Sequence, residues 1–366
     1  MVYVEKLISS LKRNKVNFFT GVPDSVLKTL GTYIDSSKNH IISANEGSAI
    51  SIATGYHLST KKIPCVYMQN SGLGNAINPL LSITHKEVYS IPMVLVIGWR
   101  GAPKLKDEPQ HLVTGRVTRQ LLNLLNIKYC VLEKDSDLKK LEKLIKYSKN
   151  NKSPIACLVK NKTLISKYKK NKIDIKNNFT TKAEAIRVLL ENVKKNTKII
   201  STTGYTSREL DHIRRKENFN NGTDFYMIGG MGHTSAVSLG TSFFNEKNDL
   251  ICLDGDGSIL MHMGTLASIG YYGKKNFKHI LLNNNMHESV GGQKTNAKNI
   301  NFSNLSKSLG YKSYDVIKNQ KDLRKKIKYF LKKKGPSFLE IKLKKGAIKD
   351  LGRPKNFIAI KKKFMK

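Results

Sequence analysis

The sequence lacks any apolar run of 18 residues, so it offers no segment that would be expected to span a membrane. Its N-terminus spaces apolar residues as a helix does, without the continuous apolar stretch of a secretory signal peptide. The four cysteines, Cys65, Cys130, Cys157 and Cys252, form no CxxC pair, and each lies in a hydrophobic, strand-like run. These absences predict a cytoplasmic protein with reduced cysteines.

Acidic residues are few: 27 Asp and Glu stand against 65 Lys and Arg, which gives a formal net charge of +38. Such an excess is typical of nucleic-acid-binding proteins. The lysines are nevertheless spread over nearly every expected helix and loop, and no RNA-recognition motif, zinc finger or glycine–arginine tract accompanies them. Abundant Lys, Asn and Ile together indicate codon bias from an AT-rich genome. We therefore expect no nucleic-acid partner, although a positive potential would steer an anionic substrate.

Short apolar runs alternate with helical patterns along most of the 366 residues. In the first half, strands are expected at 16–19, 40–43, 64–68, 93–97, 128–132 and 155–159, and helices at 24–34, 46–58, 74–84, 116–125 and 137–147. In the second half, strands are expected at 198–201, 225–228, 251–253, 280–282, 311–316 and 337–341, and helices at 181–193, 206–215, 233–244, 258–272 and 320–331. This alternation predicts an α/β fold with parallel sheets covered on both faces.

A polar segment rich in Lys and Asn, at 161–179, separates the two halves and has no sustained apolar period. We therefore expect a first domain at 1–160, a linker at 161–179, and a second domain at 180–366 that includes a basic C-terminal tail. The segments 65–72 and 252–258 resemble each other, since each reads as a strand that opens on a Gly-containing turn. The sequence thus predicts two α/β domains of similar architecture.

The run Gly-Asp-Gly-Ser at 255–258 is followed by Asn284, which lies 28 positions after Asp256 (284 − 256). This spacing suits one β-α-β step, so both would emerge at the carboxyl-terminal edge of a sheet, where open α/β folds bind ligands. A carboxylate and an amide oxygen are hard ligands for Mg²⁺, while glycines and a following helix N-terminus favour a phosphate. A lone Gly-Asp-Gly would be explained by a tight turn. The asparagine at this distance instead favours a metal-bridged diphosphate.

As a pair, these motifs resemble the cofactor signature of thiamine-diphosphate enzymes. The resemblance implies two doubly wound parallel-sheet domains, one for the pyrimidine and one for the diphosphate part of thiamine diphosphate, without a central domain. It implies Asp256 and Asn284 as side-chain ligands of Mg²⁺ and Met286 as a carbonyl ligand, although Asn285 and Met286 stand where small residues are commoner. Glu46 resembles the glutamate that drives tautomerisation of the aminopyrimidine. Without that resemblance, it would be a carboxylate beside a helix dipole.

Further cofactor contacts follow from the same resemblance. The run Gly-Gly-Met-Gly at 229–232 lies between an expected strand and helix, where Met231 would hold the cofactor bent and the Gly229 carbonyl would accept from its amino group. The hydroxyls and amides of 203–205 are candidates for the diphosphate. The expected cofactor residues are Glu46, Thr203, Gly204, Tyr205, Gly229, Met231, Gly255, Gly257, Ser258 and Asn284.

Four loop segments, at 21–25, 69–75, 98–111 and 287–293, resemble a more specific family among these enzymes. Together they look like the phosphonopyruvate decarboxylase family and the closely similar sulfopyruvate decarboxylases, and the resemblance covers about 21–341. Each charged residue of these loops is, alone, equally compatible with a solvated loop. The expected substrate residues are Asp24, Ser25, Gln69, Asn70, Arg100, His111 and His287, and the expected catalytic residues are Glu46, Ser25 and His287.

The resemblance implies decarboxylation of 3-phosphonopyruvate, a small 2-oxo acid, to phosphonoacetaldehyde and CO₂ in phosphonate biosynthesis. It also implies a homodimer or larger assembly with the cofactor at the subunit interface. Sulfopyruvate is the nearest alternative substrate, because sulfonate and phosphonate are tetrahedral anions of similar size. Carboligation of the acetolactate-synthase type is more distant, because those enzymes keep a central domain. A catalytically inactive basic binding protein is the alternative of another class, and the intact Glu46, Asp256 and Asn284 argue against it.

Overall fold

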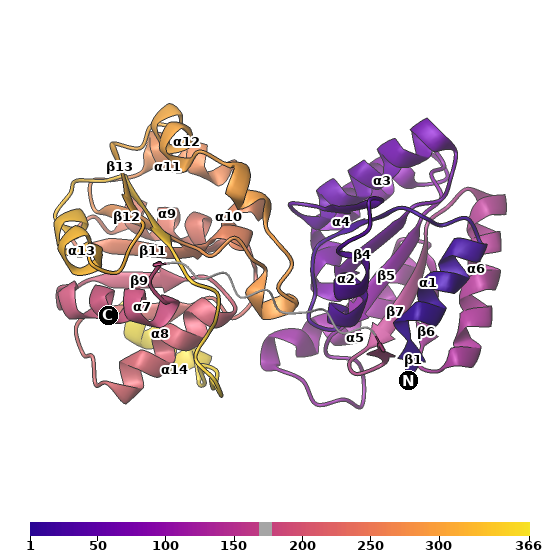
Figure 1. The fold of residues 1–366 in the computed structure, drawn as a ribbon, viewed down its shortest axis with the longest axis horizontal. Coiled ribbons are helices and arrows are strands. Elements are labelled where there is room, and N and C mark those ends of the chain that lie inside the picture. Colours follow the sequence, from indigo (N-terminus) through magenta and orange to yellow (C-terminus); the bar gives the residue numbers. More distant parts are fainter. Residues whose placement is uncertain (168–177) are drawn as a thin grey trace. The chain divides into compact units, whose positions relative to one another are not determined.

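The computed structural model of this chain describes residues 1–167 and 178–366, which form two compact units (Figure 1). The first unit comprises 1–167 together with Val290–Gln293, and the second comprises 178–289 and 294–366. Most of the expected linker, 168–177, lies outside the described residues. The short strand Leu164–Ile165 falls within the remainder of that expected linker.

The first unit alternates strands and helices along the chain. Its strands are β1 (Val2–Tyr3), β2 (Phe19–Gly21), β3 (His40–Ile42), β4 (Cys65–Gln69), β5 (Val94–Trp99), β6 (Lys128–Leu132), β7 (Ile155–Lys160) and β8 (Leu164–Ile165). Its helices are α1 (Val4–Arg13), α2 (Lys28–Ile34), α3 (Glu46–Thr60), α4 (Leu73–Pro79), α5 (Pro109–Leu124) and α6 (Leu138–Asn151). Shorter helical turns lie at Asn70–Gly72, Leu80–Thr84 and Asp135–Asp137.

The main sheet of this unit has the parallel strand order β3-β2-β4-β5-β7-β6. Side chains alternate between its two faces, as the period of a strand requires. Cys65 and Tyr67 of β4 pack with α1, α2 and α6 in one core. Val66 and Met68 of the same strand pack with α3, α4 and α5 in another. Helices therefore cover both faces of the sheet (Figure 1).

The second unit repeats this alternation. Its strands are β9 (Lys198–Ser201), β10 (Thr223–Tyr226), β11 (Leu250–Gly255), β12 (Phe277–Asn283), β13 (Ser313–Ile317) and β14 (Ser337–Lys342). Its helices are α7 (Lys182–Asn192), α8 (Tyr205–Lys216), α9 (Thr234–Phe244), α10 (Asp256–Met261), α11 (Thr265–Tyr272), α12 (Phe302–Ser308), α13 (Leu323–Leu331) and α14 (Phe357–Met365). Short turns of helix lie at Asn296–Asn299 and at Glu288–Val290, whose last residue belongs to the first unit.

The sheet of the second unit has the parallel order β10-β9-β11-β12-β14-β13. Ile251 and Leu253 of β11 pack with α7, α8 and α13 on one face. Cys252, between them, packs with α10, α11 and α12 on the other. Within the described residues, the expectation of two α/β units, each with a parallel sheet covered on both faces, is confirmed.

The two six-stranded sheets formed by the described residues have the same topology. In each, the second strand in the chain lies beside the first, and the third strand lies on the first strand's other side, so the order reverses between the first and third strands. The internal similarity between 65–72 and 252–258 falls on β4 and β11, which occupy equivalent places in the two sheets. The reversal point is where doubly wound folds bind ligands, so this edge is the expected ligand-binding edge of each unit.

Several expected boundaries are wrong. The strand expected at 16–19 begins only at Phe19 and ends at Gly21. The helix expected at 116–125 begins at Pro109, whose fixed φ suits a first helical turn, so His111 lies in a helix rather than in the expected polar loop. The helix expected at 258–272 is divided into α10 and α11, because His262 has the non-helical angles φ −135° and ψ 49°.

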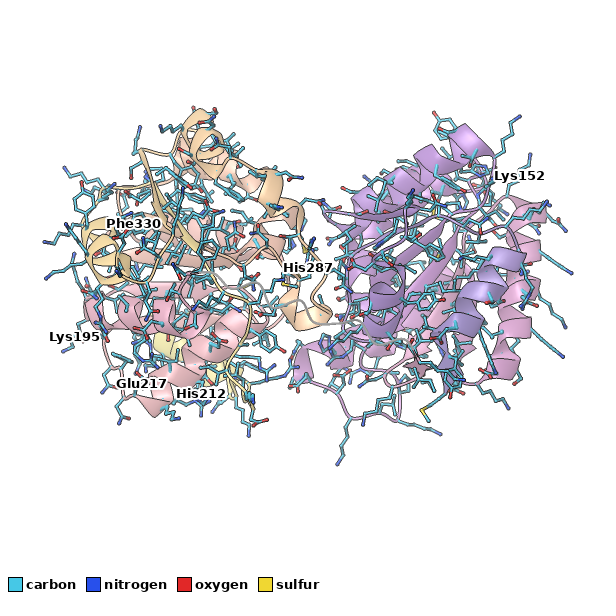
Figure 2. All side chains as sticks on the ribbon, in the orientation of Figure 1. Lys152, Lys195, His212, Glu217, His287 and Phe330 are labelled. Carbon is cyan, nitrogen blue, oxygen red and sulfur yellow. The ribbon has the colours of Figure 1, made fainter. Side chains whose placement is uncertain are left out.

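Two helices are followed by a lysine where glycine is the commoner residue. Lys61 and Lys152 follow α3 and α6 in the left-handed conformation, with φ of 60° and 47°. Lys152 lies at the periphery of the first unit (Figure 2). A left-handed backbone brings Cβ close to the following carbonyl oxygen, so these positions are strained.

Within 1–167 and 178–366, no helix combines the length and the apolar character needed to cross a membrane.

Candidate functional site

The loops that leave β9 and β11 meet at the reversal point of the second sheet. Gly255 pairs with Leu282 in the register of β11 and β12, so the segments after these strands emerge at the same edge. The expected β-α-β step at 251–282 is therefore confirmed, with its helical part divided in two. This edge carries Asp256 as the first residue of α10 and Asn284 directly after β12.

Asp256 is a buried carboxylate, only 4% exposed. Burial raises its pKa to about 6, against hydrogen bonds that lower it. Thr295 Oγ1 donates to Asp256 Oδ2 at 2.6 Å, and among the described residues Asp256 has no ion-pair partner. A buried carboxylate without a paired cation is unfavourable unless a cation binds, so this residue fits the Mg²⁺ ligand expected of it.

Asn284 is 8% exposed, and its amide group is held at both ends. Its Oδ1 accepts from the Met286 N–H at 3.0 Å, and its Nδ2 donates to Glu288 Oε2 at 3.1 Å. The intervening Asn285 has φ 56°, a conformation that asparagine tolerates better than most residues. The unusual Asn285-Met286 pair is thus accommodated by the turn.

Glu288 and Thr295 were missed by the sequence analysis, although both organise this loop. Besides Asn284, Glu288 accepts from Lys182 Nζ at 3.0 Å and from the Gly346 N–H. Thr295 donates its backbone N–H to the Asn285 carbonyl at 3.0 Å, beside its contact with Asp256. No spacing rule would find Thr295, because it is 39 residues from its partner in the chain.

His287 and Met231 both lie against the glycine that follows Asp256. A Cβ placed on Gly257 would be 2.9 Å from His287 Nδ1 and 3.5 Å from Met231 Cε, so only glycine fits between them. His287 is 8% exposed, and burial lowers its pKa to about 4, which keeps the ring neutral at ordinary pH. The position of its side chain in the loop after β12 is visible in Figure 2.

The segment 202–205 lies across the reversal point from Gly255. Thr202 and Ser258 are 3% and 4% exposed, and among the described residues their hydroxyl oxygens have no hydrogen-bond partner. A Cβ on Gly255 would be 3.6 Å from Thr202 Cγ2, so the two loops are neighbours. Unpaired buried hydroxyls beside a helix N-terminus suit a phosphate group. Of this pair, Ser258 was expected from the sequence and Thr202 was not.

Glu46 opens α3 in the first unit and is 5% exposed. Asn45 caps the helix by accepting the Ser48 N–H at 2.9 Å, which fixes the backbone before Glu46 turns inward. Asn75 Nδ2 donates to Glu46 Oε2 at 2.7 Å. A Cβ on Gly72 would lie 2.3 Å from Glu46 Oε1, so glycine leaves the space that the carboxylate occupies. Glu46 is in a different unit from Asp256.

The loops after β2, β4 and β5 meet at the reversal point of the first sheet. Asp24 accepts the N–H groups of Val26 and Leu27 and a short hydrogen bond from Gln69 Nε2. It is 2% exposed, and burial raises its pKa. Asn70 accepts the Arg100 N–H at 3.1 Å and donates to the Arg100 carbonyl at 2.9 Å.

Arg100 is held by one carboxylate that the sequence analysis did not single out. Its Nε donates to Asp107 Oδ2 at 2.8 Å, and its Nη2 donates to Asp107 Oδ1. Its Nη1 donates to Ser25 Oγ at 3.0 Å. Burial alone would raise the pKa of Asp107, but hydrogen bonds from Arg100, Gly101 and the Glu108 N–H outweigh it and hold the pKa below its ordinary value.

The structure thus groups most of the expected residues in two sets. One set in the first unit is Asp24, Ser25, Gln69, Asn70 and Arg100, and one in the second unit is Gly255, Asp256, Gly257, Ser258, Asn284, Met286, His287 and Met231. The other expected residues lie at the ends of neighbouring elements, with Glu46 at the start of α3. The rest are Thr203, Gly204 and Tyr205 at the start of α8, Gly229 after β10, and His111 in the first turn of α5.

Comparison with known proteins agrees with this arrangement. Residues 1–121 match the N-terminal TPP binding domain of thiamine pyrophosphate enzymes, and residues 202–341 match their C-terminal TPP binding domain. Thiamine pyrophosphate and thiamine diphosphate are two names for one compound.

The chain is also similar in sequence to known decarboxylases, including the three that follow. Phosphonopyruvate decarboxylase of Streptomyces viridochromogenes is 30% identical over 97% of this chain and 92% of its own length. Sulfopyruvate decarboxylase of Methanosarcina acetivorans is 26% identical over 93% of this chain and 91% of its own. The beta subunit of sulfopyruvate decarboxylase from Methanocaldococcus jannaschii is 36% identical, over 36% of this chain and 68% of its own. The chain belongs to the thiamine pyrophosphate enzymes, in the family that includes phosphonopyruvate decarboxylase.

Proposed function

We propose that this protein decarboxylates 3-phosphonopyruvate to phosphonoacetaldehyde and CO₂, with thiamine diphosphate and Mg²⁺ as cofactors. The observation that carries the proposal is the 30% identity to a phosphonopyruvate decarboxylase over 97% of the chain. The cluster around Arg100 supports it, because a phosphonate needs several directed donors to replace its lost hydration.

The second unit would hold the diphosphate and the metal. Asp256 and Asn284 would ligate Mg²⁺ by side chain and Met286 by its carbonyl, which suits the oxygen preference of this ion. The unpaired hydroxyls of Thr202 and Ser258 would donate to the diphosphate. Gly255 and Gly257 would let the diphosphate approach the backbone closely. The N–H and hydroxyl groups of the segment 203–205 would donate hydrogen bonds to it. Asp256 is buried, and although the charge of Lys182 acts on it, no cation of the described chain forms a salt bridge with it, which fits this role.

The first unit would hold the aminopyrimidine. Glu46 would exchange a proton with that ring, held in place for it by Asn75. When bound, thiamine diphosphate supplies a nucleophilic carbon and an electron sink for the loss of CO₂ from a 2-oxo acid. Met231 and the Gly229 carbonyl would fix the cofactor's conformation from the second unit. We accordingly assign 1–160 as the pyrimidine-binding domain and 180–366 as the diphosphate-binding domain.

The substrate would lie among the loops of the reversal points. Arg100, Ser25, Gln69 and His111 are the candidates for its phosphonate and carboxylate. His287 is neutral at ordinary pH because burial lowers its pKa to about 4, so it would act by accepting or donating a hydrogen bond rather than as a cation. Asp24 and Asn70 would hold these groups in position.

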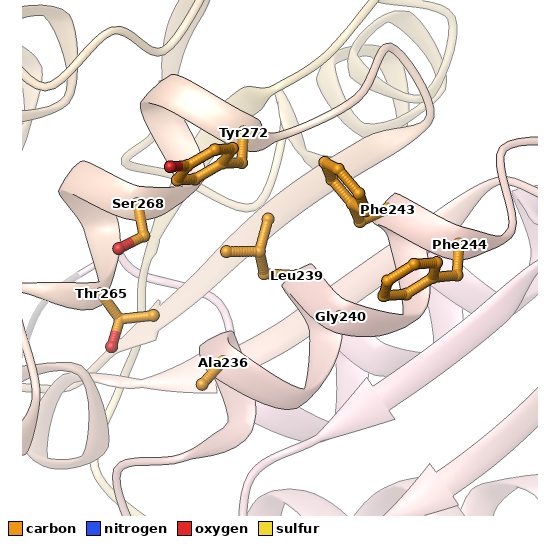
Figure 3. Close-up of a pocket in the computed structure, with 8 residues that line it drawn as sticks. All are labelled: Ala236, Leu239, Gly240, Phe243, Phe244, Thr265, Ser268 and Tyr272. Carbon is orange, nitrogen blue, oxygen red and sulfur yellow. The ribbon is translucent and has the colours of Figure 1, made fainter.

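A homodimer or larger assembly would bring Glu46 of one subunit to the metal site of another. A patch of exposed aromatic side chains on α9 and α11 supports assembly (Figure 3). Phe243, Phe244 and Tyr272 are 38%, 87% and 53% exposed around a hollow of about 470 Å³. An apolar patch of this kind marks a protein contact more often than a water-facing surface.

An aldehyde-release assay tests the proposed function. The purified protein is given phosphonopyruvate, sulfopyruvate or pyruvate, with and without thiamine diphosphate and Mg²⁺. We expect aldehyde from phosphonopyruvate, dependent on both cofactors. Faster turnover of sulfopyruvate would assign the alternative substrate, and no aldehyde from any of the three would overturn the proposal.

A further inference from the structure

Asp107 and Arg100 form a nearly buried ion pair at the carboxyl-terminal edge of the first sheet. Their side chains are 9% and 13% exposed. Asp107 accepts from Arg100 Nε and Nη2, from the Gly101 N–H at 2.7 Å and from the Glu108 N–H at 2.8 Å. The pair lies where the loops after β2, β4 and β5 meet, which is the ligand-binding edge of a doubly wound sheet.

The geometry of the pair leaves one end of the guanidinium available. Arginine has five N–H groups. Asp107 takes those on the Nε side, one from Nε and one from Nη2, and Ser25 Oγ takes one from Nη1. Within the described residues, one N–H on each terminal nitrogen is therefore left without an acceptor. Ser25 uses its oxygen to accept from Arg100, so its own O–H is free to donate.

We propose that Asp107 is a positioning residue for substrate specificity: it fixes the Nε side of Arg100 and so presents the terminal N–H groups, with the Ser25 hydroxyl, to the distal anionic group of the substrate. The proposal rests on the proposed function, since it takes the substrate to be a 2-oxo acid with a second strong anion. The remaining N–H groups on Nη1 and Nη2 can donate to oxygens of a tetrahedral anion.

Asp107 also offsets the charge of Arg100, and Asp24 and Glu108 add negative charge near it, so the cluster does not attract anions by charge alone. Recognition then depends on how well the anion's oxygens meet three oriented donors. A plain 2-oxo acid such as pyruvate has no distal anion to meet them. The cluster therefore contributes to discrimination between substrates more than to the chemistry at the 2-oxo carbon.

The opposite interpretation is that Asp107 occupies the anion site until substrate displaces it. Displacement would break all the hydrogen bonds that Asp107 accepts, including two from backbone N–H groups on either side of its own loop. It would also leave the Asp107 carboxylate and the dianionic phosphonate of the substrate beside the single positive charge of Arg100. Both effects disfavour displacement, and the two interpretations predict opposite changes in substrate affinity when Asp107 is altered.

Asp107→Glu tests the proposal in the cofactor-loaded enzyme, because it keeps the charge and moves the carboxylate by one methylene. We expect KM for phosphonopyruvate, and the inhibition constant of the unreactive probe phosphonoacetate, to rise about tenfold to a hundredfold, the range for a donor misplaced by about 1 Å. The turnover number should change little, and so should KM for pyruvate. Asp135→Glu is the matched control, because Asp135 forms an exposed ion pair with Lys6 in the same unit.

A double-mutant cycle tests whether Asp107 acts through Arg100. In an Arg100→Ala background, Asp107→Glu should leave the inhibition constant of phosphonoacetate unchanged, because the group it positions is absent. An equal loss in both backgrounds, or equal losses on phosphonopyruvate and pyruvate, would overturn the proposal.

Asp107→Asn provides a second variant if Asp107→Glu fails to fold. Tighter binding of phosphonoacetate by Asp107→Asn would establish displacement and overturn positioning. A wild-type enzyme that releases no aldehyde from phosphonopyruvate would overturn the proposed function and this inference together. An active wild type with an unaffected Asp107→Glu variant would overturn this inference alone.

Discussion

Thr295 Oγ1 donates a 2.6 Å hydrogen bond to Asp256 Oδ2, and its backbone N–H donates to the Asn285 carbonyl at 3.0 Å. Thr295 thus joins the carboxylate that follows β11 to the loop that follows β12. The two segments that would hold a metal are tied together by a residue outside both motifs. Groups that orient a metal ligand in this way commonly alter metal affinity tenfold to a hundredfold when removed.

Replacing Thr295 with valine should therefore weaken Mg²⁺-dependent retention of thiamine diphosphate by roughly tenfold, because Asp256 loses its oriented donor.

Asp256→Ala should abolish that retention, since a ligand and its negative charge disappear together. Cofactor titration by calorimetry with and without Mg²⁺ measures both effects. Thr241→Val is the control, because the Thr241 hydroxyl donates to the Val237 carbonyl of its own helix. Retention by Asp256→Ala equal to the wild type would remove the metal assignment.

Glu46→Gln should fold normally and lower turnover by roughly 10²- to 10⁴-fold, the range for a lost proton-transfer partner. Gly72→Ala should give a similar loss without touching the carboxyl group, because its methyl would lie 2.3 Å from Glu46 Oε1. Gly74→Ala is the matched control, since a Cβ there meets nothing within 4 Å. Turnover by cofactor-saturated Glu46→Gln near that of the wild type would contradict the assignment of Glu46.

Mixed subunits should recover activity if Glu46 acts on the metal site of a second copy. Glu46→Gln and Asp256→Ala homodimers have no intact site, but a hybrid dimer would have one. We expect the mixture to regain up to about a quarter of wild-type turnover after subunit exchange, since half of the dimers are hybrids with one working site each. Exchange is verified by mass spectrometry of differently tagged subunits. Verified exchange without recovery would indicate that each site is built within one chain.

Arg100→Lys should reduce kcat/KM for phosphonopyruvate far more than for pyruvate, because an ammonium cannot hold Asp107 and two substrate oxygens at once. A selective loss of about tenfold or more would correspond to at least one charge-assisted hydrogen bond. Steady-state kinetics with both substrates measures it. Equal losses on the two substrates would mean that Arg100 is structural.

Stability should depend on pH through Asp107, whose pKa lies below its ordinary value of 3.8 in the folded protein. Because the unfolded chain takes up this proton first, the carboxylate's contribution to the free energy of unfolding is fully present above the unfolded pKa. It is lost as pH falls below 3.8 through the lower folded pKa. The difference between wild type and Asp107→Asn in urea unfolding should therefore be constant near neutral pH and shrink below about pH 4. A difference that grows on acidification would contradict this linkage.

The β-α-β step between Asp256 and Asn284 could be predicted because it depends on short-range patterns. Buried runs predict its strands, and parallel pairing then brings their ends to one edge. The break between α10 and α11 could not be predicted in this way. The residues from Ser258 to Tyr272 keep an apolar pattern across His262, so periodicity gave one continuous helix.

The side-chain partners of the site were harder to predict than its motifs. Asp107 stood out only as one charge in a polar loop, because nothing in its spacing specifies that it folds back on Arg100 seven residues earlier. Thr295 and Glu288 have ordinary surroundings in the sequence. Contacts of this kind depend on how loops return to the sheet edge, which local propensity does not determine.

The lysines that follow α3 and α6 mark two positions where the fold carries backbone strain. Lys61 and Lys152 each hold a backbone conformation that costs an L-residue about 1 kcal/mol, and glycine would relieve it. The chain tolerates this strain at helix ends in the first unit, away from Glu46 and Arg100. The lysine-rich composition therefore places its backbone strain at helix ends rather than at the groups expected to act in catalysis. Replacing these two lysines with glycine should raise the enzyme's free energy of unfolding.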